Sequence, residues 1–343
     1  MLEIFRLYRS IAGRLMRKQS TPVLLLVGLF ALILVQPCHL SSQAAPQDRG
    51  PGDRRRAERG AIELASGARV EFSSFASPAL KEDREFSIYL PPAYAKNNHN
   101  YPVVYFLHGL NNDHTSWTVD RYGHIHEQVD KLIAEKKIPE ILMVHPKGDN
   151  SFYTNYVDGS RNYEDFITSD LVQHVEKTYR AKSGSRWRTI GGTSMGGFGA
   201  LKIAFKHRNL YSAAAAHSPI VFLADPAQMS DQTKNSGRFE WFTRMITPMF
   251  GNPVDVERWR ANNPLDLAKT ASLSGLRIYF DYGTADRYNQ SIGLGQALKA
   301  LDAILTERQV AHTFKEHPNE PHGWELVSLH LSESLAFLCE SFK

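Results

Sequence analysis

The chain is poor in cysteine: only Cys38 and Cys339 occur among its 343 residues. Two thiols cannot build the disulfide framework that holds small secreted domains together, so a hydrophobic core must stabilise the fold. Hydrophobic residues make up 42% of the chain and charged residues 22%. That balance is typical of a globular protein and argues against a disordered or fibrous chain.

The chain also has little net charge, and that charge is unevenly placed. The formal total is +4, and residues 1–45 carry five basic side chains against one acidic side chain. The formal net charge of residues 46–343 is therefore zero. A neutral body argues against a strongly basic nucleic-acid-binding domain, and we expect no nucleic acid partner.

The sequence lacks the common motifs for nucleotides and metals. The glycine-rich turn at residues 191–196 has no lysine in the register of a phosphate-binding loop, and no G-x-G-x-x-G occurs. His126 and Glu127 begin an H-E pair, but Asp130 stands where H-E-x-x-H needs its second histidine. His114 and His124 add no recognisable ligand spacing. We expect neither a metal nor a cofactor.

What the chain does have, at its start, is a leader. Basic residues precede an uncharged apolar run over residues 23–35, and Ser42-Gln43-Ala44 resembles a small-residue cleavage site. Residues 1–45 are therefore interpreted as an export signal, which predicts a periplasmic or extracellular protein. The alternative is an uncleaved N-terminal membrane anchor, although the run is shorter than the ~20 residues that span a bilayer.

The remaining chain reads as a flexible linker (46–60) followed by one domain (61–343). Short apolar segments alternate with amphipathic ones, which predicts an α/β fold: a mostly parallel sheet with helices on both faces. Two strands that precede the alternation are expected to be antiparallel. Residues 222–270, rich in aromatic residues and methionine, are interpreted as an insertion that covers a pocket. The strands are expected at 70–75, 85–90, 103–107, 141–144, 188–191, 213–216, 277–281 and 313–316, and the helices at 125–135, 163–180, 195–207 and from 324 onward.

The strongest single motif is Gly192-Thr193-Ser194-Met195-Gly196, which matches G-x-S-x-G between an expected strand and an expected helix. This strand–turn–helix setting is that of a nucleophile elbow, in which a sharp turn projects the serine over a helix N-terminus. The glycines are needed where a Cβ would clash with neighbouring backbone. We therefore predict Ser194 as a nucleophile.

A serine nucleophile needs a base and an orienting carboxylate, which follow it in the order Asp/Glu then His in this layout. Asp281 ends an expected strand, and Asp286 lies in the loop beyond it. His317 and His322 both fall in a later strand-to-helix loop. Spacing alone leaves both choices open.

Several longer motifs carry a more specific resemblance over about residues 60–340. The chain resembles the esterase family of the α/β-hydrolase superfamily, which includes S-formylglutathione hydrolases, feruloyl esterases, enterochelin-esterase-like proteins and mycolyltransferases of the antigen 85 type. The resemblance implies an α/β-hydrolase fold. It rests on Ser87-Ile-Tyr-Leu-Pro-Pro-Ala-Tyr94, Tyr101-Pro-Val-Val-Tyr-Phe-Leu-His-Gly109, Asn112-Asp-His-Thr-Ser-Trp117, the serine motif extended to Leu201, Asp281-Tyr-Gly-Thr-Ala-Asp286 and Pro321-His-Gly-Trp324.

The resemblance also assigns roles. It places the acid at Asp286 and the base at His322, although Pro321 stands where the family usually has glycine. Met195, which follows the nucleophile, is expected to supply one backbone N–H of the oxyanion hole. By resemblance Leu110 supplies the second.

These features predict an exported serine carboxylic-ester hydrolase that works through an acyl-enzyme. An alternative with the same chemistry is an acyltransferase that moves the acyl group to a sugar or lipid hydroxyl. A protein of this fold that only binds its ligand would lack at least one residue of the Ser-His-Asp triad, and this sequence has all three. The expected partner is a small-molecule or glycan-linked ester, with membrane contact only through an uncleaved leader.

Overall fold

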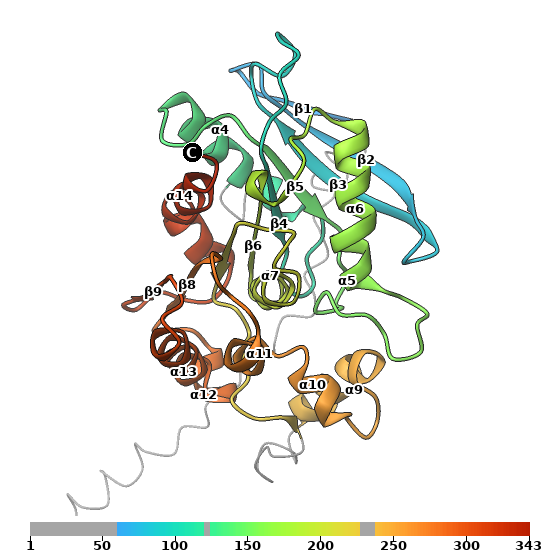
Figure 1. Cartoon of the computed structure of the whole chain (residues 1–343), viewed down its shortest axis with the longest axis vertical. Coiled ribbons are helices and arrows are strands. Elements are labelled where there is room, and N and C mark those ends of the chain that lie inside the picture. Colours follow the sequence, from blue (N-terminus) through green and yellow to red (C-terminus); the bar gives the residue numbers. More distant parts are fainter. Residues whose placement is uncertain (1–59, 120–123, 227–236) are drawn as a thin grey trace, which may run out of the picture. The chain divides into compact units, whose positions relative to one another are not determined.

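The computed structural model describes residues 60–119, 124–226 and 237–343. The expected leader (1–45), nearly all of the linker (46–60) and part of the 222–270 insertion lie outside the described residues. Within these ranges one sheet has the strand order β1-β2-β3-β5-β4-β6-β7-β8-β9 (Figure 1). The strands are β1 (Ile62–Glu63), β2 (Arg69–Ser77), β3 (Glu82–Leu90), β4 (Val103–Leu107), β5 (Leu142–Pro146), β6 (Arg188–Thr193), β7 (Ala213–His217), β8 (Arg277–Gly283) and β9 (His312–His317).

The sheet is mostly parallel. The pairs β1–β2, β2–β3 and β3–β5 are antiparallel, and every pairing from β5 through β4 to β9 is parallel. β2 and β3 pair along their whole length, from Arg69 opposite Leu90 to Ser77 opposite Glu82. The predicted α/β class, with two antiparallel strands ahead of a parallel sheet, is confirmed. β1 is a third antiparallel strand that the sequence pattern does not reveal.

Helices lie between and beyond the strands. Short 3₁₀ turns span Ser116–Thr118 and Ser185–Trp187. The helices are α4 (Ile125–Ala134), α5 (Tyr163–Asp165), α6 (Leu171–Thr178), α7 (Met195–Lys206), α9 (Gly237–Phe250), α10 (Val256–Arg260), α11 (Pro264–Thr270), α12 (Tyr288–Ile292), α13 (Leu294–Glu307) and α14 (Trp324–Glu340).

Both faces of the sheet are covered, as β4 shows. Its residues 103, 105 and 107 belong to the apolar cluster under α6, α7 and α13, and residues 104 and 106 belong to the cluster under α4 and α14. Figure 1 shows α4 and α14 together on one side and α6 and α7 on the other. Because successive side chains of a strand alternate between faces, a strand covered on both sides must be apolar throughout.

The structure corrects three sequence-based boundaries. One helix is predicted over 163–180, but a π-helical segment, Phe166–Asp170, separates α5 from α6, and the helix ends at Thr178. β8 continues past Asp281, so this residue lies inside the strand rather than at its end. β9 ends at His317, so this residue belongs to the strand rather than to the loop after it. Both strands are longer because β8 and β9 pair as far as Gly283 opposite His317.

The 222–270 segment is mostly helical where it is described. α9 and α10 contact each other, and α11 packs on α7 and α13. Residues 227–236 of this segment lie outside the described residues. Across the ranges that the structure describes, no helix combines the length and apolarity needed to cross a membrane.

The connection from β6 to α7 is the tightest point of the fold. Ser194 has φ +57° and ψ −118°, a conformation that side-chain-bearing residues rarely adopt. A Cβ at position 192 would lie 2.5 Å from the Gly196 carbonyl carbon, and one at position 196 would lie 2.0 Å from the Leu107 carbonyl oxygen. The turn therefore accepts only glycine at both positions, as the serine motif predicts.

We expect Gly196→Ala to destabilise the fold by about 3 kcal/mol or more, because backbone must move to admit the methyl group. Gly197→Ala is the matched control on the same helix. Its methyl would meet Pro219 at 3.0 Å, and we expect a cost of about 1 kcal/mol. Urea unfolding measures both. Equal midpoints for the two variants would contradict this account of the turn.

Candidate active site

Ser194 lies at the carboxyl end of β6, as the first turn of α7 begins. Its N–H donates to the His217 carbonyl at 2.8 Å, and its own carbonyl accepts from Phe198 (3.0 Å) and Ile220 (3.2 Å). These backbone bonds hold the serine in its strained conformation, so that the hydroxyl has a fixed position. Ser194 is 5% exposed.

The structure brings the predicted acid and base to this serine. His322 Nε2 lies 2.8 Å from Ser194 Oγ, and His322 Nδ1 lies 2.5 Å from Asp286 Oδ2. With Nδ1–H donating to the carboxylate, Nε2 of a neutral ring is free to accept the serine hydroxyl. The three side chains thus form one continuous hydrogen-bonded chain.

Two packed loops place this acid and base. Asp286 follows β8, and His322 lies between β9 and α14. The loops touch backbone to backbone: Ala285 N–H donates to the Glu320 carbonyl, and a Cβ on Gly283 would lie 2.0 Å from that same oxygen. Their spacing is therefore fixed independently of the triad side chains.

Tyr288 completes the setting of both partners. Its backbone N–H donates to Asp286 Oδ1 at 2.8 Å, which leaves Oδ2 for the histidine. Its ring meets the His322 imidazole edge to face, with centroids 4.7 Å apart. Sequence reasoning did not identify Tyr288, because it lies in a short helix with no motif of its own.

The rival acid, Asp281, belongs to a different group of side chains. Its carboxylate lies 2.9 Å from His217 Nδ1, 3.0 Å from the Tyr279 hydroxyl and 3.3 Å from His317 Nε2. Full burial alone would raise the pKa of Asp281, but His217 and His317 hold it well below the usual range. His217 Nε2 in turn lies 2.8 Å from Ser334 Oγ on α14. The rival base His317 thus pairs with the rival acid, and neither is bonded to Ser194.

The residues expected to supply the oxyanion donors, Met195 and Leu110, each follow a residue at the site: Ser194 itself and Gly109. Met195 begins α7, so its N–H has no partner within the helix. Leu110 follows Gly109, where a Cβ would lie 3.3 Å from Ser194 Cβ, which shows how closely this loop approaches the serine. Trp324 Nε1 donates to Asn112 Oδ1 at 2.6 Å and ties the same loop to the start of α14.

His108, next to these donors, is structural. Gly148 N–H donates to its Nε2 at 2.9 Å, and Nδ1 lies 2.8 Å from the Gly109 carbonyl. Burial lowers the pKa of His108 to about 4, so the ring is neutral at physiological pH. It therefore braces the loop rather than exchanging protons.

A small apolar pocket lies beside the first turns of α7, since Phe198 is one turn beyond Ser194. It is lined by Phe152, Phe198, Phe222, Phe242, Ile246, Phe250, Trp259 and Asn263. Six of these residues come from the 222–270 segment. Phe152 and Phe198 come from elsewhere in the chain and carry no sequence signal for this role.

Two clusters in the described part of the chain offer three possible metal ligands each: His124, His126 and Glu127, and His317, Glu320 and His330. The His317 and His330 rings stack with centroids 3.5 Å apart and an interplanar angle of 17°. Ring nitrogens bind metals in the ring plane, so two stacked imidazoles direct their lone pairs side by side rather than toward one ion. The geometry gives no support for a metal site there.

Comparison with known proteins supplies the family. The family model described as "Putative esterase" matches residues 77–331. The chain belongs to this esterase family. The predicted family and the α/β-hydrolase fold are therefore confirmed, and the predicted enzyme class, a serine carboxylic-ester hydrolase, is confirmed at the level of the family.

Individual relatives of this esterase are distant. Esterase Rv1288 of Mycobacterium tuberculosis is 32% identical over 153 residues, covering 44% of this chain and 32% of that protein. The chain thus spans about a third of the length of the curated relatives it matches. Among solved structures, a ferulic acid esterase superposes with TM-score 0.66 at 22% identity, covering 80% of this chain and 99% of that one. An S-formylglutathione hydrolase from Agrobacterium tumefaciens gives 0.65 at 20% identity, over 83% and 100%.

A pair of substitutions distinguishes the roles of the Asp281 and Asp286 carboxylates. Asp286→Asn should lower kcat by about 10³–10⁴-fold with little loss of stability, because the imidazole loses the acceptor that fixes its tautomer. Asp281→Asn should instead destabilise the fold by about 3 kcal/mol, because it breaks a buried pair. Ester turnover and urea unfolding are measured on both. A larger loss of turnover per folded molecule for Asp281→Asn would move the acid to β8.

Proposed function

We propose that this esterase hydrolyses carboxylic esters through a covalent acyl-serine on Ser194. The observation that carries the proposal is the continuous hydrogen-bonded chain from Ser194 through His322 to Asp286. A serine hydroxyl is a weak nucleophile until a base removes its proton, and this arrangement supplies that base with a fixed tautomer.

In the first half-reaction, Ser194 Oγ attacks the ester carbonyl carbon while His322 Nε2 takes the hydroxyl proton. The carbonyl oxygen becomes an oxyanion, which the N–H groups of Met195 and Leu110 stabilise. Such preorganised donors usually make the largest single contribution to lowering the activation free energy. Asp286 stabilises the imidazolium. The C–O bond to the alcohol then breaks, and the alcohol leaves with the proton from His322.

In the second half-reaction, water attacks the acyl-serine and gives its proton to His322. The second tetrahedral intermediate collapses, the bond to Ser194 Oγ breaks, and the serine recovers its proton. The carboxylic acid leaves. No group beyond the chain and water is required by this sequence of steps.

The proposed substrate is a small-molecule or glycan-linked ester with an apolar acyl or aryl portion. Support comes from the pocket beside α7, whose lining is aromatic and aliphatic except for Asn263. Apolar pockets with a few polar groups are the usual form of small-ligand sites. Transfer of the acyl group to a sugar or lipid hydroxyl uses the same intermediate, so the acceptor is decided by experiment.

Export is part of the proposal and is supported by sequence alone. The basic start, the apolar run at 23–35 and the small residues near Ala44 match a cleavable signal. An exported esterase would meet periplasmic or extracellular esters. In the alternative, the uncleaved segment would anchor the enzyme to a membrane.

Replacing Ser194 with alanine tests the nucleophile. Ser194→Ala should abolish both fluorophosphonate labelling and hydrolysis of aryl esters, while its circular dichroism and unfolding midpoint stay close to those of the wild type. Labelling that persists in the folded variant would place the nucleophile elsewhere. Running the wild type with and without a sugar acceptor, and measuring free acid against acylated sugar, separates hydrolysis from transfer.

N-terminal sequencing of protein recovered from outside the cytoplasm tests export. We expect the mature chain to begin near Ala45, because cleavage follows the small-residue site. An intact Met1 recovered in a membrane fraction would contradict cleavage and favour the anchor.

A further inference from the structure

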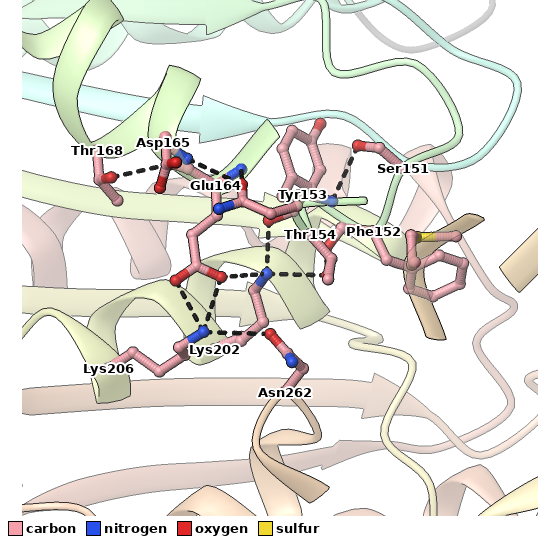
Figure 2. A network of polar contacts seen from close by, with 12 residues as sticks. Ser151, Phe152, Tyr153, Thr154, Glu164, Asp165, Thr168, Lys202, Lys206 and Asn262 are labelled. Carbon is pink, nitrogen blue, oxygen red and sulfur yellow. Dashed lines mark hydrogen bonds and ion pairs between the residues drawn. The ribbon is translucent and has the colours of Figure 1, made fainter. Parts of the chain in front are cut away.

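A buried lysine lies on the helix that follows the nucleophile. Lys202, two turns beyond Ser194 on α7, is 0% exposed. Its ammonium group donates to the Tyr153 carbonyl at 2.5 Å, to Thr154 Oγ1 at 2.9 Å and to Glu164 Oε2 at 2.9 Å (Figure 2). All three donors of the ammonium group therefore have an acceptor.

The charge on Lys202 is balanced by Glu164, which is itself 5% exposed. Lys206 Nζ lies 2.8 Å and His207 Nε2 lies 2.7 Å from Glu164 Oε1. Burial would raise the pKa of Glu164, but Lys202, His207 and Lys206 together hold it far below the usual range. The carboxylate is thus ionised and bonded on both oxygens.

A buried ion pair is weak evidence for stability, because well-packed apolar residues often serve as well. Its geometry can instead specify where a segment lies. The segment held here is unusual: Asp149, Phe152 and Tyr153 have φ of +46°, +47° and +52°. Side-chain-bearing residues keep such conformations only where the surroundings enforce them. The bond from Lys202 to the Tyr153 carbonyl is one such constraint.

This segment reaches the proposed site at two places. The Tyr153 hydroxyl donates at 3.0 Å to the carbonyl of His108, directly ahead of the Gly109–Leu110 turn. The Tyr153 ring leaves no room for a side chain at Gly199, where a Cβ would lie 2.5 Å from it. Phe152, the preceding residue, lines the apolar pocket. The segment therefore contacts the expected oxyanion loop through Tyr153 and forms part of the pocket wall through Phe152.

We propose that Lys202 is a positioning residue for ester hydrolysis. From within α7 it fixes the 152–154 backbone, so that Tyr153 holds the loop carrying the Leu110 N–H against Ser194 and Phe152 keeps the pocket wall in place. The inference rests on the proposed function, since it assigns Lys202 to the oxyanion hole and acyl pocket of that reaction.

The chain offers a matched control for this role. Lys206 lies one turn further along α7 and binds the same Glu164 carboxylate, but its other bond goes to Asn262 rather than to the 152–154 segment (Figure 2). Lys202→Met and Lys206→Met each remove one cation from Glu164. Only the first removes the donor to Tyr153.

We expect Lys202→Met to lower kcat/KM per folded molecule by between about 10- and 100-fold, as displacement of a catalytic group by about 1 Å commonly does. Lys206→Met should stay within twofold of the wild type. Esters of a bulky apolar acid should lose more than acetyl esters, because the Phe152 wall also moves. Tyr153→Phe should lower kcat with KM nearly unchanged, because it removes only the brace on His108.

A double variant separates positioning from folding. Lys202→Met/Glu164→Gln removes both members of the buried pair, and it should recover much of the unfolding midpoint lost in Lys202→Met. Its kcat/KM should remain low, because the Tyr153 carbonyl still lacks its donor. Kinetics are normalised to the folded fraction, measured by near-ultraviolet circular dichroism.

Two failures are distinguishable. If Lys202→Met and the double variant retain the kcat/KM and acyl selectivity of Lys206→Met per folded molecule, the positioning role is overturned while hydrolysis by Ser194 stands. If the wild type itself hydrolyses no ester and takes up no fluorophosphonate, the proposed function is overturned and the inference falls with it.

Discussion

The rest of the site depends on one close contact, between Leu107 at the end of β4 and Gly196 in the first turn of α7. Gly196 packs against the Leu107 carbonyl so closely that no side chain fits between them, and Ser194 takes a conformation that side-chain-bearing residues rarely adopt. The loop that holds Gly109 and Leu110 begins directly after Leu107, and Gly109 lies so close to Ser194 that a Cβ on it would be 3.3 Å from the serine Cβ. Backbone packing thus sets the position of Ser194 and of the start of the loop after β4, and the side-chain hydrogen bond from the Tyr153 hydroxyl to the His108 carbonyl adds to it. Such an arrangement suits a site that must keep its geometry as charge develops.

The remaining partners depend on a second backbone contact, between the loops after β8 and β9. This contact sets Asp286 and His322 within reach of Ser194, whereas Asp281 and His317 belong to the strands themselves. Each strand therefore contributes one residue to an Asp–His pair, and the loop after it contributes one residue to a second pair. The Asp281–His317 pair, extended by His217 and Ser334, joins β7, β8, β9 and α14. The Asp286–His322 pair meets the serine. Both carboxylates are buried, so the partners around each one, rather than burial or residue type, separate a structural carboxylate from one suited to orient a base.

Much of this arrangement could be predicted from the sequence, because it is encoded locally. Three local patterns predict their own surroundings. The apolar run of β4 predicts a strand buried on both faces, the glycines around Ser194 predict a tight turn, and the apolar stripe of α14 predicts a helix packed on one face. The acid and the base needed a family resemblance, since spacing alone did not choose between Asp281 and Asp286. The π-helical segment and Tyr288 were not predicted, because no period or motif marks them. α13 was not predicted either, although Leu294, Leu298, Leu301 and Leu305 recur at helical spacing along it. The Lys202–Glu164 pair could not be predicted either, because the two residues are 38 positions apart and the sequence does not show that the fold brings them together.

In the proposed mechanism Ser194 carries the acyl group of a covalent intermediate, and trapping that intermediate is the most direct test. Wild-type protein is mixed rapidly with an aryl ester, the release of the phenol is followed, and samples quenched in acid are digested and mapped by mass. The account predicts a burst of one phenol per folded molecule and an acyl group on the peptide containing Ser194, which decays no more slowly than steady-state turnover. An acyl group on any other residue, or turnover with no acylated peptide at any time, would contradict it.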